Sequence, residues 1–150
     1  MLPDWQDIQY LQAGSPAQRA AHAALQQHAV LAALQVYDPI LVGTFPLDIT
    51  VVGSDLDIVC EVHDCAEFSR RVGQHFSHLP AYSFRSLGSR EFPCWVASFY
   101  LEGLEVELFG QPLPTKQQHG YRHLVVEARL LAAGGTTLQE KVRDLKAQGV

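Results

Sequence analysis

Four carboxylates in two closely spaced pairs are the residues of this sequence best suited to chemistry. A single residue separates Asp55 from Asp57 in SDLDIVCEV, and a single residue separates Glu105 from Glu107 in GLEVELF. On a β-strand, residues i and i+2 point to the same face, roughly 6.6 Å apart. Two carboxylates about 4 Å apart repel by about 4 kcal/mol at an effective dielectric constant of 20. A cleft that holds them therefore needs a compensating cation or a proton.

A divalent cation is the natural partner for these acids. Mg²⁺ (or Mn²⁺) binds carboxylate oxygens and keeps coordination positions open for phosphate. If the two strands are neighbours, we expect Asp55, Asp57, Glu105 and Glu107 to line one patch as metal ligands. Three carboxylates with one or two metal ions are the arrangement that aligns an attacking hydroxyl with a nucleotide phosphate. The alternative for each pair is a strand whose charged residues simply face solvent.

A glycine and two hydroxyl residues stand near the first acidic pair. Gly43 and Thr44 follow the short apolar run Ile40–Val42, and Ser54 directly precedes Asp55. A glycine at a strand end lets the backbone approach a phosphate closely, and neighbouring N–H and O–H groups can donate to it. The combination predicts a phosphate cradle beside a pair of metal ligands.

In this pattern the sequence resembles the nucleotidyltransferase superfamily of polymerase-beta type. The resemblance is carried by GTFPL, GSDLDIVCEV, LEVELFGQP and QHGYRHLVVEARLL, in this order, over roughly residues 40–131. The same four elements are similar to a bacterial family of unknown function within that superfamily. The resemblance implies a protein that binds Mg-NTP and transfers a nucleotidyl group to an unknown acceptor hydroxyl.

The resemblance also implies roles for individual residues. Gly43 and Thr44, helped by Ser54, would hold the triphosphate, with Thr44 in place of the usual serine. Asp55 and Asp57 would be catalytic metal ligands. The third catalytic acid would be Glu105 or Glu107, and we prefer Glu107, which lies nearer the end of its strand.

A helix expected after Pro112 and Pro114 adds two nucleotide-binding residues. Gln118 and Arg122 are four residues apart and share a face of this helix. Both match the pattern of the similar family, and a guanidinium can bind two phosphate oxygens at once. The structural alternative for Arg122 is an ion pair with Glu107 or another strand acid.

The elements that must position these residues predict an α+β fold, a small mixed β-sheet with helices packed on it. Ser15-Pro16 starts a helix that ends at Asp38-Pro39. Helical periodicity covers 64–78, and the strands at 94–100 and 103–109 are joined by a tight turn at Glu102-Gly103. Thr115 is expected to cap a helix to about Leu131, and Gly134-Gly135 to separate it from a last helix.

Length and composition fit this reading. The 150 residues suit a single nucleotidyltransferase-like domain over 1–150, with its core at about 40–131. The net charge of −5 argues against bulk nucleic-acid binding. Residues 1–115 carry 5 Lys/Arg against 13 Asp/Glu, whereas 116–150 carry 6 against 3. No membrane span or secretory signal is visible, and the cysteines read as reduced thiols, so we expect a cytoplasmic protein.

Two other functions stay open at this point. One is a catalytically inactive nucleotidyltransferase-fold binding module that works with a partner protein, which would supply the helical domain that larger nucleotidyltransferases use to hold their acceptor. The other is a zinc-binding domain with Cys60, His63 and Cys65, and His75 and His78 later, whose spacing matches no standard zinc knuckle.

Overall fold

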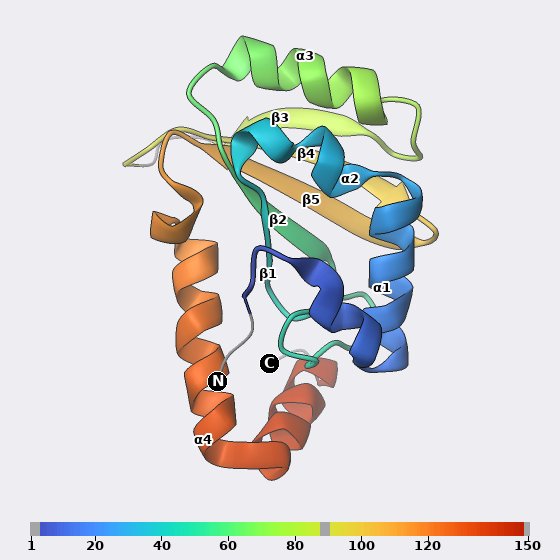
Figure 1. The fold of residues 1–150 in the computed structure, drawn as a ribbon, viewed down its shortest axis with the longest axis vertical. Helices are drawn as coiled ribbons and strands as arrows, with labels where there is room; N and C mark the ends of the chain where they lie inside the picture. Colours follow the sequence, from blue (N-terminus) through green and yellow to red (C-terminus); the bar gives the residue numbers. More distant parts are fainter. Residues whose placement is uncertain (1–3, 88–90, 149–150) are drawn as a thin grey trace.

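A mixed five-stranded sheet forms the centre of the protein in a computed structural model, which describes residues 4–87 and 91–148 (Figure 1). Its strand order is β1-β2-β5-β4-β3. The central pair, β2 and β5, is parallel, and every other neighbouring pair is antiparallel. The predicted α+β class with a small mixed sheet is therefore confirmed. The elements in chain order are η1 (Ile8–Ala13), α1 (Pro16–Gln27), α2 (Val30–Ala33), η2 (Gln35–Tyr37), β1 (Ile40–Val42), β2 (Leu56–Glu61), α3 (Cys65–Phe76), β3 (Ser83–Leu87), β4 (Cys94–Leu101), β5 (Leu104–Gln111), η3 (Thr115–Gln117) and α4 (His119–Ala147).

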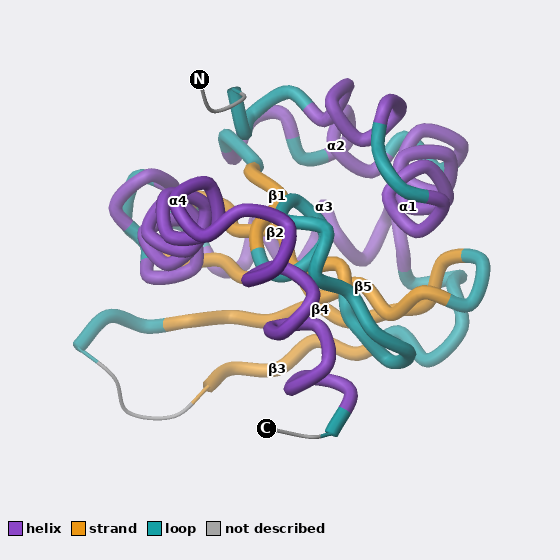
Figure 2. The backbone as a smooth tube through the Cα atoms, turned by 90° about the horizontal axis from the view of Figure 1, so that it is seen from below, coloured by secondary structure: helices purple, strands orange, loops and turns teal. Residues whose placement is uncertain are grey.

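Helices cover both faces of the sheet unequally (Figure 2). Side chains of α1, α2 and α3 join Ile58, Phe99 and Leu108 in the larger core cluster. On the other face, Leu124 and Ala128 of α4 pack in a smaller cluster with Val42 and Val59. The second cluster covers only part of its face, and the rest is where the acidic side chains lie. In the part of the chain described, no helix is long and apolar enough to span a membrane.

The N-terminal helix begins as predicted and ends early. The Ser15 hydroxyl accepts from the Gln18 N–H while the Gln18 side chain accepts from the Ser15 N–H, a capping box with Pro16 at the first helical position. A continuous helix to Asp38 was the wrong prediction, because the backbone at Ala29 is left-handed (φ 50°). This bend lets Val30 and Leu34 turn inward, where both are fully buried.

The C-terminal region also departs from its prediction in detail. Thr115 starts a short 3-10 turn instead of capping the long helix, and its buried hydroxyl donates to Asp38 Oδ2 over 3.2 Å. The helix itself begins at His119, and Gly135 breaks its direction with a non-helical backbone (φ 69°, ψ −164°). The interruption expected at this pair of glycines is therefore present, as a kink within α4.

Candidate functional site

The acidic residues are presented on one face by two adjacent strands. Asp55 directly precedes β2, Asp57 lies on β2, and Glu105 and Glu107 lie on β5. In the parallel register Asp57 is the partner of Glu107. The alternate residues Leu56, Ile58, Val106 and Leu108 are fully buried on the opposite face. This burial fixes the register, because a slip of one residue would place carboxylates in the apolar core.

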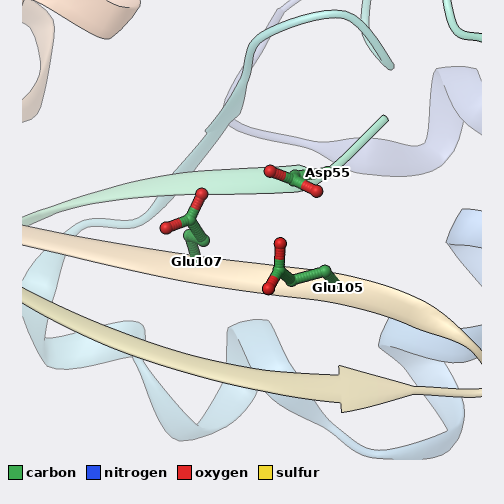
Figure 3. Close-up of side chains that lie close together, drawn as sticks. All are labelled: Asp55, Glu105 and Glu107. Carbon is green, nitrogen blue, oxygen red and sulfur yellow. The ribbon is translucent and has the colours of Figure 1, made fainter. Parts of the chain in front are cut away.

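Three of the four carboxylates converge. One oxygen from each of Asp55, Glu105 and Glu107 lies within 4.8 Å of the others, and all three side chains are half-buried. Figure 3 shows them leaning into the same space between β2 and β5. The sequence prediction that acids of two strands meet at one patch agrees with this geometry.

Asp57 stands slightly apart from that trio, at the same patch. Its Oδ1 atom is buried and, among the described residues, has no hydrogen-bond partner. Burial, and then the negative charges of Glu107, Asp55 and Glu105, raise the pKa of Asp57 to about 7. Burial and the charge of Glu105 also raise the pKa of Asp55. These carboxylates therefore repel one another when all are ionised, which a divalent cation would relieve.

The glycine next to the acids is required by the backbone and by space. Gly43 follows β1 and has a φ of 81°, a conformation that side-chain-bearing residues rarely adopt. A Cβ at this position would lie 3.0 Å from Asp57 Oδ2. Gly43 thus leaves open the volume directly beside a carboxylate oxygen.

The two hydroxyl residues have local roles in the structure. The Ser54 hydroxyl accepts from the Val51 N–H over 2.9 Å and closes the turn that leads into β2. The Thr44 carbonyl accepts from the Ile49 N–H over 3.2 Å, and the residue is half-buried beside Gly43. Thr44 thus lies in the turn after β1, and Ser54 lies in the turn directly before Asp55.

Arg85 is a site residue that the sequence analysis missed. From β3 its guanidinium donates to Ser98 Oγ over 3.1 Å and lies 3.3 Å from Glu107 Oε2. The sequence analysis considered an ion pair between Arg122 and Glu107, and in the structure it is Arg85 that pairs with Glu107. The signal available was weak: an arginine in SFRSL, on a strand whose partners the sequence does not specify.

The two residues predicted to bind nucleotide from the last helix lie in different places: Gln118, which directly precedes α4, lines the same cavity as Asp57, whereas Arg122 on α4 lies outside that cavity. Gln118 is 2% exposed, and its amide donates to the carbonyls of Cys60 and Leu113, over 2.8 and 3.1 Å. These bonds tie the start of α4 to the sheet. Arg122 is exposed and lines a groove of about 620 Å³ together with Lys116.

Two cavities of similar size reach the acidic patch from opposite ends. The first, about 300 Å³, is bounded by Asp55 and Glu105. The second, about 340 Å³, is bounded by Gly43, Asp57 and the first turns of α4. The acids are thus divided between the two cavities, Asp55 and Glu105 in the first and Asp57 in the second.

The donor set fits Mg²⁺ or Mn²⁺. All the groups are carboxylate oxygens, the ligands these ions prefer, and Asp57 Oδ1 is a buried oxygen without a partner among the described residues. The predicted zinc alternative receives no such support, since Cys60 is fully buried in the core cluster on the other face of the sheet.

Comparisons with known proteins identify a solved structure with a similar fold and a family to which the sequence belongs. A solved structure of the polymerase core of TRAMP, an RNA surveillance complex, has a similar fold, with a TM-score of 0.56 at 14% sequence identity. The similarity covers 89% of this chain and 42% of that one, so this chain spans less than half the length of its structural relative. The fold is thus a small nucleotidyltransferase-like fold. No curated protein matches the sequence. A family model described as a domain of unknown function, DUF4269, matches residues 23–150, and the chain belongs to that family.

Proposed function

We propose that this protein is a metal-dependent nucleotidyltransferase, which binds Mg-NTP and transfers a nucleotidyl group to an acceptor hydroxyl. One observation carries the proposal: Asp55, Glu105 and Glu107, from the start of β2 and from β5, converge within 4.8 Å, and Asp57 lies between this group and Gly43 as the strand partner of Glu107. The nucleotidyltransferase-like fold supports it. The crowding of the acids, seen in the raised pKa of Asp57, is the cost that a bound cation offsets.

Each part of the site has a task in this proposal. Asp55, Asp57 and Glu107 are the catalytic ligands that would hold the cation, and Glu105, which converges with Asp55 and Glu107, completes the set of metal ligands. When bound, the cation lowers the pKa of the acceptor hydroxyl and neutralises charge that develops on the phosphate. The chain contributes orientation, because its strands fix the carboxylates before substrate arrives.

The nucleotide is placed on the side of Gly43. The backbone there is open to close approach, and Thr44 follows it with a hydroxyl group; Ser54 lies in the first cavity beside Asp55, and we assign its hydroxyl to the same nucleotide. The second cavity shares His119 with the groove that carries Lys116 and Arg122, so cations lie on this side. We assign Arg122 to the phosphates or ribose of the nucleotide at this rim, and Gln118 to support of the cavity wall.

Calorimetry with Mg-ATP tests the proposal. The wild-type protein should bind Mg-ATP, EDTA should abolish binding, and Asp55→Asn should weaken it at least 10-fold. Asp144→Asn, an exposed acid on α4, is the matched control and should bind normally. Unchanged affinity in Asp55→Asn would remove the proposal.

A second assay separates the enzyme from an inactive binding module. Incubation with Mg²⁺ or Mn²⁺ and each α-labelled NTP should release pyrophosphate and yield a labelled product. Binding without either would favour the module that works with a partner protein.

A further inference from the structure

Gln118 has an amide oxygen that the fold does not use. The residue is 2% exposed, and its amide nitrogen donates to the carbonyls of Cys60 and Leu113 over 2.8 and 3.1 Å. Both partners are acceptors, so the nitrogen faces them and the oxygen points elsewhere. That oxygen, Oε1, is buried and has no hydrogen-bond partner among the described residues. Because Gln118 also lines the second cavity, a ligand there is placed to supply the missing donor.

The second cavity has an apolar floor directly beside the acids. Asp57 is the strand partner of Glu107, and two residues further along the same strands Val59 is the partner of Phe109. Residues two apart on a strand share a face, and both apolar side chains line the cavity. Leu124 of α4 lines it from the helix. Aliphatic and aromatic side chains of this kind pack against the faces of a planar ring.

The Gln118 amide lies about one nucleotide length from the acids. Its nitrogen is bonded to the Cys60 carbonyl, and Cys60 is three residues beyond Asp57 on β2. At about 3.3 Å per residue, this is roughly 10 Å along the strand. A nucleotide spans a comparable distance from its α-phosphorus to the far edge of its base. A phosphate at the acids is therefore compatible with a base edge at Gln118.

We propose that the second cavity holds the base of the nucleotide, and that Gln118 selects bases that carry an exocyclic amino group over bases that carry a carbonyl in its place. This inference rests on the proposed function and names the class of nucleotide that the site prefers. An amino group donates to the amide oxygen of Gln118, whereas a base carbonyl would leave two acceptors facing each other without a donor.

The other polar groups of the cavity do not determine this choice. They are two carboxylates, one amide and two imidazoles, from Asp57, Glu127, Gln111, His119 and His123. The two histidines are exposed, and Gln111 and Glu127 are half-buried, so water can serve these groups whichever base is bound. Asp57 is assigned to the cation. The buried oxygen of Gln118 has no such alternative, and its pairing therefore depends on the base.

Two matched pairs of nucleotides test the selection, in calorimetry with Mg²⁺. CTP and UTP differ by an amino group or a carbonyl at one ring carbon, and ATP and ITP differ in the same way. Wild type should bind CTP at least 10-fold more tightly than UTP, and ATP at least 10-fold more tightly than ITP. In Gln118→Leu, whose fold is checked by circular dichroism, both ratios should fall close to one. A merely structural role for Gln118 would weaken all four nucleotides alike and leave the ratios unchanged.

A second pair of variants tests which cavity holds the base. Phe109→Leu removes an aromatic ring from the second cavity and should weaken all four nucleotides several-fold, while Mn²⁺ binding without nucleotide stays unchanged. Tyr100→Leu removes an aromatic ring from the first cavity, is the matched control, and should bind normally.

Three outcomes would overturn the assignment. They are equal affinity of wild type for both members of either pair, a preference retained in Gln118→Leu, and loss of affinity in Tyr100→Leu instead of Phe109→Leu. Absence of binding of every Mg-NTP to wild type would instead refute the proposed function.

Discussion

Removing one negative charge from the acidic patch should stabilise the cation-free protein. In the variant Asp57→Asn, the side chain keeps its shape and loses the charge whose burial and repulsion raise the pKa of Asp57 from 3.8 to about 7. A shift of about 3 pKa units corresponds to about 4 kcal/mol at 1.36 kcal/mol per unit. The side chain is only half-buried, so solvent screening reduces this, and we expect about 2 kcal/mol.

The direction of this stability change, and the pH range over which it occurs, follow from the linkage between proton binding and folding. Because the folded-state pKa of Asp57 is raised, the unfolded state ionises first. The stability of the wild type is therefore complete below the unfolded value of 3.8 and is lost as pH rises to about 7. Asp57→Asn escapes this loss, so its advantage should be small at pH 4 and complete at pH 8.

Thermal unfolding followed by circular dichroism, in EDTA at both pH values, measures the effect. For a protein of 150 residues, about 2 kcal/mol corresponds to a melting temperature about 4 to 8 °C higher at pH 8. Asp144→Asn should stay within about 0.5 kcal/mol of wild type. If Asp57→Asn melted at or below the wild-type temperature at pH 8, the carboxylate would be stabilising the fold and our account of crowded acids would be refuted.

Three further perturbations test other parts of the account. Gly43 and Gly103 both have a φ of 81°, so Gly43→Ala and Gly103→Ala should each lower the free energy of unfolding by about 1 kcal/mol. Only at Gly43 would the added Cβ meet a carboxylate oxygen. Gly43→Ala alone should therefore lose Mg-ATP affinity, at least 10-fold in calorimetry. Arg85→Gln removes a cation that competes for Glu107, so Mn²⁺ should bind several-fold more tightly in an electron paramagnetic resonance titration, and weaker binding would show that Arg85 supports the site. Gln118→Leu leaves two backbone carbonyls without their donor and should cost about 2 kcal/mol in urea unfolding; a neutral result would contradict the structural role given to this amide.

The sheet and the acidic patch could be predicted because both depend on the alternation of apolar and acidic residues along each strand. Apolar residues at 56, 58, 106 and 108 alternate with the acids, and the period of two places all four carboxylates on the exposed face. The glycine turn after β1 was also predictable, because a strand end followed by Gly-Thr needs few distant contacts to form.

Other features depend on contacts that the sequence does not display. The helix break at Ala29 follows from burying Val30 and Leu34 against the sheet, and helix propensity alone favours continuity. Arg85 reaches Glu107 only because β3 joins the far edge of the sheet, two strands away from β5. Gln118 was predicted to bind nucleotide, and the structure places its amide on two carbonyls, a partnership set by the approach of α4 to β2.

The location of a bound divalent cation tests the central claim most directly. Crystals grown with Mn²⁺ and a non-hydrolysable ATP analogue can be measured at a wavelength where manganese scatters anomalously. The account predicts an anomalous peak among the carboxylates of Asp55, Asp57 and Glu107, with the phosphates of the analogue beside Gly43. A nucleotide bound elsewhere, or no manganese peak at these carboxylates, would contradict it.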